Sequence, residues 1–247
     1  MLRGAGSLCK QGVMMEASNN ALRLGIGFGE EQEEVEVGVH SLIIAGWTGS
    51  DLKAMEAHIV ELEKLGVKRP KRTPIFYRGA ASLLTQDEVI EVVGSSASGE
   101  VEPVLFSTPD GLLLGMGSDH TDRHVETIGI TLSKQLCAKP IARQCWRFEE
   151  VADRWESLVM RSWVTRSGKR ELYQEGPLGK LRHPRELMRL YGGDAYVLPP
   201  GTAMFCGTLA AHGDIAPAEI FEMELEDPVL HRRIGHSYRT IELPIEG

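Results

Sequence analysis

The stretch from about residue 88 to residue 132 constrains the fold more than any other part of the chain. It holds four short segments rich in Val, Ile and Leu, which read EVIEVVG, EVEPVLF, GLLLGMGSDHT and HVETIGITL. Clusters of Gly, Ser, Pro and Asp separate them, and such clusters typically mark turns between strands. Upstream, residues 35–46 alternate in polarity and then become continuously apolar, as expected of a strand that enters a core. The sequence therefore predicts many short strands.

Two other segments have the period of a helix. The first, residues 51–65, follows candidate N-caps at Ser50 and Asp51, and Gly66 ends it. Its predicted buried stripe consists of Leu52, Met55, Ile59, Leu62 and Leu65. The second predicted helix covers residues 148–160. Few helices among many strands indicate an α+β, β-rich fold rather than a doubly wound sheet.

Net charge and the length of the apolar runs exclude several classes of protein. The chain has 27 Lys and Arg against 35 Asp and Glu, a formal net charge of −8, which argues against nucleic-acid binding. No apolar run approaches the roughly 20 residues that a membrane span needs, so no membrane association is expected. Glycine-rich nucleotide motifs and a GxSxG elbow are also absent. These exclusions leave a soluble globular protein.

Cysteine usage and the first residues indicate the compartment. Four cysteines without a CxxC pair are typical of reduced thiols, so a cytoplasmic location is expected. Residues 1–18 lack the continuous apolar segment of a secretory signal. We expect a disordered tail or an over-long start there, because Met14 and Met15 offer later initiation points. Residues 19–70 then form a small N-terminal part, and residues 71–247 form a larger β-rich domain.

Glu100 and Glu102 form the first candidate site. Side chains two residues apart on a strand point to the same face. Paired carboxylates on one face are unfavourable unless a cation bridges them or water separates them, so a solvated strand face is the alternative. Adding Asp119 gives a three-carboxylate site, and ligation by oxygen alone suits Mg²⁺, Mn²⁺ or Ca²⁺.

Residues 118–124 allow a different interpretation. If this segment is extended, His120, Asp122 and His124 share one face, and imidazole is a common zinc ligand. Three ligands from one strand, without a fourth elsewhere, make this zinc site a weaker hypothesis than the carboxylate site.

Three further features carry less specific signals. His58 and Glu61 are neighbours on the surface of the predicted helix, where a carboxylate can orient an imidazole or simply form a polar edge. Lys134 follows an apolar segment that is predicted as a strand, and a surface lysine is the usual explanation. Residues 200–208 lead from a turn into a short apolar strand that ends in Gly-Thr, where a hydroxyl and backbone amides can meet a ligand.

Taken in chain order, these features resemble the fumarylacetoacetate hydrolase superfamily. Its members carry an HxxE helix, a Pro-x-Phe segment, an ExE pair, an Asp-containing segment that ends in Arg, a Lys motif, an Asn-Gly-x-x-x-Gln stretch and a closing Gly-Thr strand. The counterparts here are His58 with Glu61, residues 74–78, Glu100 with Glu102, residues 118–123, Ser133 with Lys134, residues 173–176 and residues 200–208. The resemblance spans residues 55–242, and the finer motifs are similar to a branch catalogued as a domain of unknown function.

The chain also departs from the pattern of the superfamily. Arg78 stands where the family usually has Lys, Leu209 replaces a proline, and His120 and Asp122 add unusual polarity. The spacing from Asp119 to Lys134 is short. These departures leave the metal site in place and leave the substrate open.

The resemblance implies a fold and an activity. The fold is a mixed β-sandwich roll of the fumarylacetoacetase C-terminal type, expected as a homodimer, with a lid-like helix in residues 19–70 and the catalytic domain in residues 71–247. The activity is that of a divalent-metal-dependent hydrolase, which cleaves a C–C bond of a small anionic keto acid or diketone, similar to an acylpyruvate, through a metal-bound enolate. Alternatives at the same site are a hydratase, decarboxylase or lyase acting on a 2-keto acid, and a non-catalytic ligand-binding protein.

Metal and catalytic roles follow from the same resemblance. Glu100, Glu102 and Asp119 hold Mg²⁺, or Mn²⁺ or Ca²⁺ in its place. Lys134 stabilises developing negative charge.

The remaining implied roles concern proton transfer and the substrate. Glu61 orients His58, which activates water or moves a proton. The implied substrate-binding residues are Tyr77, Arg78, Arg123, Gln174 and Thr208. Alternatively, Arg123 only pairs with neighbouring carboxylates.

Overall fold

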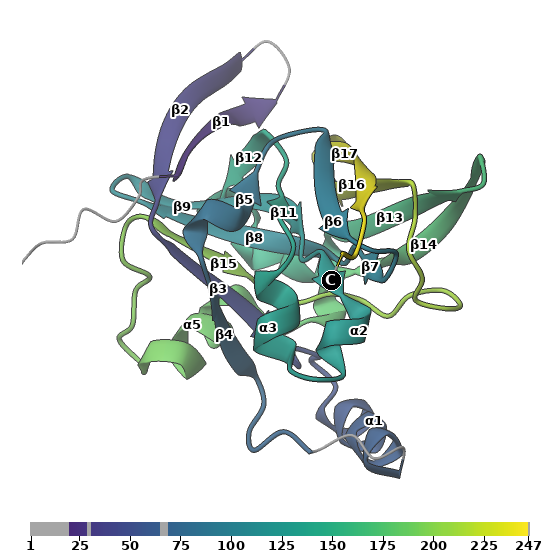
Figure 1. Cartoon of the computed structure of the whole chain (residues 1–247). Helices are drawn as coiled ribbons and strands as arrows, with labels where there is room; N and C mark the ends of the chain where they lie inside the picture. Colours follow the sequence, from purple (N-terminus) through teal and green to yellow (C-terminus); the bar gives the residue numbers. More distant parts are fainter. Residues whose placement is uncertain (1–19, 29–30, 65–68, 247) are drawn as a thin grey trace, which may run out of the picture.

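Two packed β-sheets form the body of the protein in the computed structural model, which describes residues 20–28, 31–64 and 69–246 (Figure 1). The larger sheet has the order β2-β1-β12-β9-β8-β15-β3-β4. Its strands are β1 Asn20–Phe28, β2 Glu31–Val39, β3 Ser41–Gly46, β4 Ile75–Gly79, β8 Val101–Thr108, β9 Gly111–Ser118, β12 Gln144–Arg147 and β15 Thr202–Phe205. It is mixed, because β1 pairs with β12 and β15 pairs with β3 in parallel.

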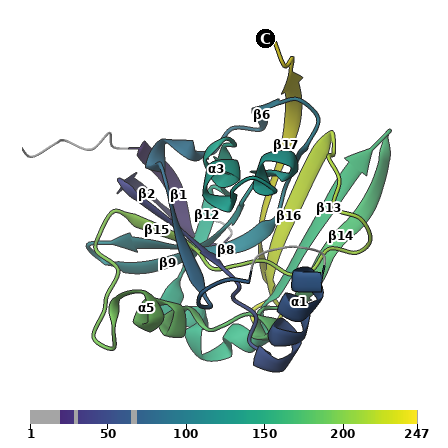
Figure 2. The same cartoon turned by 60° about the horizontal axis from the view of Figure 1, so that its bottom comes forward.

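The second sheet has the order β14-β13-β16-β17-β6. Its strands are β6 Val89–Val93, β13 Val159–Arg166, β14 Lys169–Pro177, β16 Ile220–Asp227 and β17 Arg232–Leu243. Two short pairs complete the strands, namely β7 Ala97–Ser98 with β10 Thr121–Asp122, and β5 Leu84–Thr85 with β11 Lys139–Pro140. Figure 2 shows the two sheets side by side, with the β13–β14 hairpin extending at one edge.

Short helices lie around the sheets. They are α1 Leu52–Lys64, α2 Arg123–Glu126, α3 Ile130–Gln135, α4 Phe148–Val151 and α5 Pro184–Gly192, with the 3₁₀ helices η1 Ala81–Leu83, η2 Ala152–Ser157 and η3 Leu178–Lys180. None of the helices in the described part of the chain has the length and hydropathy that a membrane span requires.

The hydrophobic core explains the strand patterns of the sequence. Leu105 and Leu114 of the larger sheet pack in one cluster with Met160 and Phe221 of the second sheet. The opposite face of the larger sheet covers a second cluster that includes Phe106. Since β8 is buried on both faces, its middle residues 103–106 are continuously apolar, whereas β16 has one face toward solvent and alternates. This is the β-rich α+β roll that the sequence predicts.

Two predicted segments have different bounds in the structure. Residues 35–46 form two strands rather than one, and the break falls at His40, whose backbone N–H donates to Gly201 O at 2.9 Å. The predicted helix over residues 148–160 is reduced to α4 and η2, because Arg154 departs from helical dihedral angles and β13 begins at Val159.

The segment HVETIGITL is helical, so the strand predicted there is wrong. Asp122 caps α2, and its carboxylate accepts a hydrogen bond from Val125 N at 2.9 Å. Ser133 N donates to Gly129 O at 3.0 Å as α3 begins. Local capping therefore outweighs the β-branched residues of this segment. Lys134 consequently lies on a helix, not after a strand.

Helix α5 was not predicted, although it has two start signals. Pro184 occupies its first turn, and the ring of His183 accepts a hydrogen bond from Arg185 N at 3.1 Å.

Helix α1 agrees with the predicted bounds but not with the predicted stripe. Ile59 is buried, whereas Leu52 is 56% exposed. The side chain of Leu62, together with Leu65 and Gly66, lies outside the described residues. In both cartoon views α1 lies at the edge of the molecule (Figures 1 and 2).

The predicted division at residue 70 is crossed by the larger sheet. Strand β3 on its N-terminal side pairs with β4 and β15 on its C-terminal side. The tail predicted for residues 1–18 lies outside the described residues.

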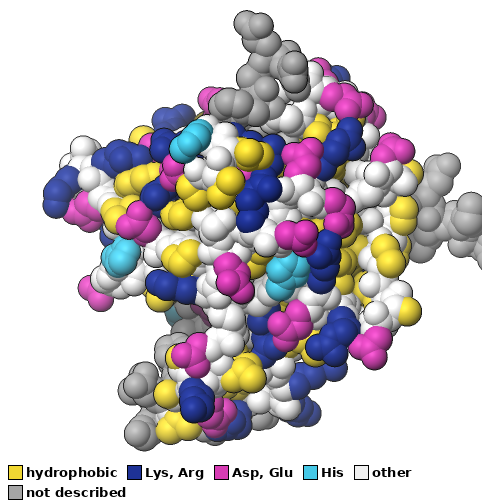
Figure 3. Space-filling model, turned by 180° about the vertical axis from the view of Figure 1, so that it is seen from behind, with side chains coloured by type: hydrophobic (Ala, Val, Ile, Leu, Met, Phe, Trp, Pro, Cys, Tyr) yellow, Lys and Arg dark blue, Asp and Glu magenta, His cyan; other side chains and the backbone are white. Residues whose placement is uncertain are grey.

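On the face shown in Figure 3, acidic and basic side chains are interspersed.

Candidate functional site

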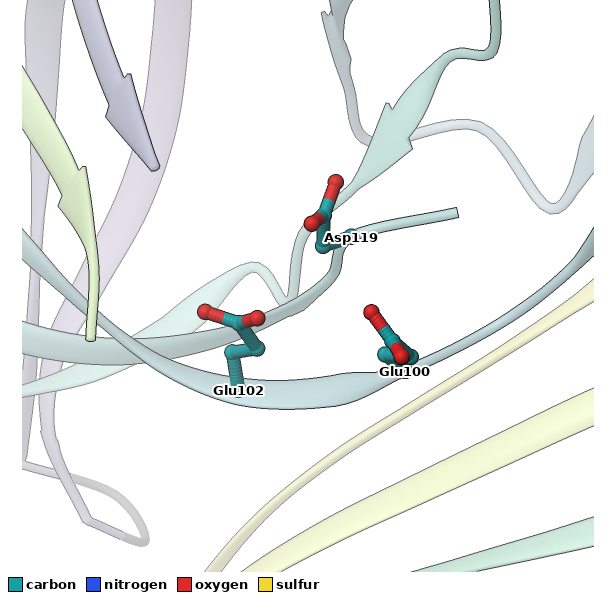
Figure 4. A group of neighbouring side chains, drawn as sticks. All are labelled: Glu100, Glu102 and Asp119. Atoms are coloured by element: carbon teal, nitrogen blue, oxygen red, sulfur yellow. The ribbon is translucent and has the colours of Figure 1, made fainter. Parts of the chain in front are cut away.

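Three carboxylates converge where β8 and β9 pair. Glu102 is on β8, Glu100 directly precedes this strand, and Asp119 directly follows β9 (Figure 4). In the register, Val101 lies opposite Ser118, and Asp119 N donates to Glu100 O at 2.9 Å. One oxygen atom from each carboxylate lies within 4.8 Å of the other two. The strand register therefore assembles the three-carboxylate cluster that the sequence predicts.

Glu102 is the least compensated of the three acids. It is 3% exposed, and Gly207 N donates to its Oε2 at 2.7 Å. Burial raises the pKa of Glu102 well above its usual range, and neighbouring Asp119 raises it further. Gly207 has a φ of 102°, and a Cβ there would lie 1.7 Å from Thr48 Oγ1, so this position requires glycine.

Two lysines hold Asp119, which is fully buried. Lys134 of α3 donates to Oδ2, and Lys139 Nζ lies 3.1 Å from Oδ1. Burial raises the pKa of Asp119, but the two lysines lower it by more, so this carboxyl is ionised. Lys139 also donates to the carbonyl of His120 and is itself fully buried.

Lys139 was missed by the sequence analysis. Its signal is a lysine inside the otherwise apolar segment CAKPIA, where an unpaired charge would be costly. Such a lysine predicts a buried acidic partner, but the sequence does not say which one.

The donor set fits a divalent cation. Carboxylate oxygens are the ligands that Mg²⁺, Mn²⁺ and Ca²⁺ prefer. Two oxygens that bind the same ion with bonds of roughly 2.1 to 2.4 Å lie no more than roughly 4.2 to 4.8 Å apart, and the oxygens of Glu100, Glu102 and Asp119 lie within 4.8 Å of one another. Buried Glu102 beside ionised Asp119 is unfavourable without such an ion.

Glu100 and Glu102 line a pocket of about 850 Å³. Most of the candidate residues from the sequence line it, namely Tyr77, Glu100, Glu102, Arg123, Lys134, Gln174 and Thr208. Residues from α1, α3 and the loop after β15 complete the walls. Several segments that are distant in sequence therefore line one cavity together with Glu100 and Glu102.

Gln174 is a bracing residue of this pocket. Its Oε1 accepts hydrogen bonds from Val101 N at 3.1 Å and Ser162 Oγ at 2.9 Å. Its Nε2 donates to Thr208 Oγ1 at 2.7 Å and Leu209 O at 2.6 Å. These four hydrogen bonds satisfy the amide of Gln174. The side chain therefore holds β8 and the loop after β15 in a fixed position relative to each other.

Thr208 is tied to the same brace. Its hydroxyl accepts from Gln174 and donates to Val101 O at 2.8 Å.

Arg123 pairs with neighbouring acids, as the alternative interpretation has it. It lies 3.2 Å from Glu100 Oε1 and 3.0 Å from Glu126 Oε2, and its Nε donates to Ser98 Oγ at 2.7 Å. Burial lowers its pKa, but Glu100 and Glu126 raise it by more, so the guanidinium stays charged.

Arg78 is not brought to the carboxylates. Neighbouring residues on β4 face opposite sides of the strand. Tyr77 therefore lines the pocket that Glu100 and Glu102 also line, whereas Arg78 lines a separate pocket. Arg78 donates to Ser41 Oγ at 2.8 Å and to Tyr191 OH at 3.3 Å.

The zinc hypothesis has no support in the described part of the chain. The ring of His120 is hydrogen-bonded to Tyr238 OH at 2.9 Å, Asp122 caps α2, and His124 is exposed. Burial lowers the pKa of His120 to about 3. Among the described residues, the side chains that converge as potential metal ligands are Glu100, Glu102 and Asp119.

His58 and Glu61 belong to α1, but their side chains lie outside the described residues. The backbone places Ala54, which lines the pocket, one helical turn before His58.

Comparisons with solved structures identify the fold. The chain is similar to yeast ynq8, a fumarylacetoacetate hydrolase family protein, at 16% identity, covering 84% of this chain and 95% of that one, with a TM-score of 0.58. It is also similar to a 2-keto-3-deoxy-D-arabinonate dehydratase at 13% identity, covering 82% and 73%, with a TM-score of 0.57. A third similar structure is 2-hydroxyhepta-2,4-diene-1,7-dioate isomerase from Mycobacterium marinum, at 13% identity, covering 87% and 82%, with a TM-score of 0.57.

Comparisons of sequence give the family. Among curated proteins, none matches this chain. The family model described as "Protein of unknown function (DUF2848)" matches residues 45–238, which include the three carboxylates, both lysines and every wall of the pocket. The chain therefore belongs to the DUF2848 family, and its fold is similar to that of fumarylacetoacetate hydrolase family proteins.

Proposed function

We propose that the protein is a divalent-metal-dependent hydrolase that cleaves a C–C bond in a small keto acid or diketone of the acylpyruvate kind. The observation that carries the proposal is the convergence of Glu100, Glu102 and Asp119, the first two of which line the pocket. A divalent cation held there supplies Lewis acidity toward the keto and carboxylate oxygens of a ligand. Enzymes with this fold that act on keto acids and related dioates support the proposal.

Lys134 stabilises negative charge in this reaction. Burial lowers its pKa, but Asp119, Glu100 and Glu102 raise it by more, so the ammonium stays protonated at neutral pH. Cleavage of the C–C bond leaves its electron pair on the keto-acid fragment as an enolate. A fixed ammonium in the wall of a buried pocket lowers the energy of that charge.

His58 and Glu61 complete the proposed mechanism. The imidazole, oriented by Glu61, takes a proton from the water that adds to the acyl carbonyl, and returns it to the enolate carbon. The place of Ala54 in the pocket wall supports this role for α1.

The test is a metal-supplemented activity screen against acylpyruvates and oxaloacetate. Wild type is compared with Glu102→Ala and with a matched control, Glu222→Gln, whose acid pairs with Arg170 outside the pocket. We expect turnover in wild type and the control, and none in Glu102→Ala or after strong chelation. Turnover that survives either treatment would rule out the carboxylate-metal mechanism.

Hydration, dehydration or decarboxylation of a 2-keto acid is the second candidate. A dehydratase with the same fold favours it. The same screen separates the candidates by product, because hydrolysis yields two acids, decarboxylation releases CO₂, and hydration changes only the water content of the substrate. A cation-binding protein without any turnover would support the non-catalytic alternative.

A further inference from the structure

Trp47 holds an unusual backbone conformation in the wall of the pocket. It directly follows β3, and its φ of 59° lies in the left-handed region, which bulky residues rarely adopt. Such a conformation costs energy and persists only where neighbouring structure enforces it.

The residues beside Trp47 enforce this conformation. Thr48 is buried, its carbonyl accepts from Arg182 N at 2.7 Å, and its hydroxyl packs against Gly207. On the other side, a Cβ at Gly46 would lie 3.0 Å from the Tyr77 ring. The chain is therefore fixed on both sides of Trp47, which keeps this residue in the pocket wall.

Tyr77 is the aromatic neighbour of Trp47. It lies on β4, which pairs with β3, and both residues line the pocket. Burial raises the pKa of the Tyr77 hydroxyl, and the neighbouring Trp47 side chain partly offsets that rise. Two flat side chains therefore share one wall of the cavity.

This aromatic wall adjoins the polar end of the site. Lys134 Nζ lies 5.9 Å from the centre of the Tyr77 ring and also pairs with Asp119. Met55 of α1 and Ile130 of α3 line the same cavity and add apolar surface. A ligand whose anionic head is held at Lys134 and the carboxylate-bound cation thus meets aromatic surface directly next to that head.

The size of the pocket agrees with a ligand larger than the head alone. Cavities of about 300 to 1,000 Å³ hold drug-sized molecules. At about 850 Å³, this one has far more room than a three-carbon keto acid fills. Aromatic side chains favour flat partners that stack or meet edge to face.

We propose that Trp47 and Tyr77 form a subsite for an aromatic ring, so that the natural ligand is a keto acid bearing an aryl group. This inference rests on the proposed function, because it places the keto-acid head at the metal centre. It goes beyond that function by assigning the rest of the substrate. Aliphatic acyl chains and second carboxylates are the classes that it disfavours.

The test measures binding of phenylpyruvate and pyruvate to the Mn²⁺-loaded protein by calorimetry. We compare wild type with Trp47→Gly and with Trp163→Ala. Glycine adopts a φ of 59° without strain, so Trp47→Gly removes the ring and is expected to melt no lower than wild type. Trp163 is a matched control, because its ring lies 4.4 Å from the Arg170 guanidinium and outside the pocket.

We expect wild type and Trp163→Ala to bind phenylpyruvate at least tenfold more tightly than pyruvate. In Trp47→Gly this ratio should fall below threefold. Equal affinities in wild type, or a preference that survives Trp47→Gly, would overturn the aryl subsite. If neither ligand binds, or if binding needs neither Mn²⁺ nor Glu102, the proposed function fails and the subsite fails with it.

Discussion

Glu102 and Asp227 are both buried carboxylates, yet their surroundings affect them in opposite directions. Asp227, at the end of β16, is fully buried and lies 2.8 Å from Arg154 and 3.2 Å from Arg232. Burial raises its pKa, but its hydrogen bonds, those from Arg154 foremost, lower it by more. Leu230 N adds a hydrogen bond at 3.3 Å.

Glu102 accepts a hydrogen bond from Gly207 N, but no arginine or lysine forms an ion pair with it in the described part of the chain. Its near neighbours include two other acids, Asp119 and Glu100, and its pKa is raised. A buried acid that is surrounded by guanidinium and amide donors stabilises the fold. A buried acid that is placed against other acids lowers stability until a cation joins them. The contrast separates structural from functional carboxylates in one molecule.

Glu102→Gln gives the largest expected effect. It removes one charged ligand, so Mn²⁺ affinity measured by calorimetry should fall at least about 100-fold, beyond the range seen when an outer partner of a ligand is lost. In chelator the melting temperature should stay equal or rise, because an uncompensated buried charge is gone. Unchanged Mn²⁺ affinity would contradict the assignment.

Asp227→Asn should do the reverse. Two arginines lose their shared partner, so the free energy of unfolding measured in urea should fall by about 3 kcal/mol, while Mn²⁺ affinity is unaffected. The folded pKa of Asp227 lies below its unfolded value near 3.8. Its contribution is therefore present above that value and is lost as the pH falls through the folded pKa, so wild type and variant should converge in acid. A constant difference down to pH 2 would refute this account.

Lys139→Met should have an intermediate effect. Asp119 keeps Lys134 but loses its fully buried partner, and the His120 carbonyl loses a donor. We expect a loss of about 2 kcal/mol in urea unfolding with chelator present. Added Mn²⁺ should reduce that loss, because the variant site has one positive charge fewer and should bind the cation more tightly, which stabilises its folded state more than that of wild type. Lys169→Met, which removes an exposed pair with Glu171, is the control, and an equal loss there would argue against a special role for Lys139.

Arg78→Met should have the smallest effect. Arg78 faces the other side of β4, so kcat/KM for any substrate found should stay within about twofold of wild type. A tenfold fall in kcat/KM would mean that the substrate also contacts the Arg78 side of β4, and would contradict the separation of the two pockets.

The strand pairing behind the carboxylate cluster was largely predictable. Two acids at a spacing of two, followed by a turn and a second apolar strand, bring Asp119 next to Glu100 once β8 and β9 pair. The α2–α3 segment was not, because its β-branched residues favour a strand and the capping role of Asp122 was read as a possible zinc ligand.

Other parts of the site depend on contacts that sequence spacing does not contain. Tertiary packing brings Lys139 into an ion pair with Asp119. The amide of Gln174 makes all its hydrogen bonds with four partners from three separate segments. The left-handed conformation of Trp47 is likewise imposed by Thr48 and Gly46, which fix the chain on each side. These are long-range or steric effects, and no local pattern in the sequence predicts them.

The β8–β9 register has a consequence for how such a protein can diverge. The same pairing that buries Leu105 and Leu114 in the core aligns Glu100, Glu102 and Asp119, so a slip of one residue would lose the core and the ligands together. Trp47 and α1, by contrast, lie outside these strands. Mutations there can change the wall of the pocket without disturbing the carboxylate cluster. One scaffold can thereby support several reactions, because the changes are confined to residues such as Trp47 and those of α1, outside the β8–β9 pair.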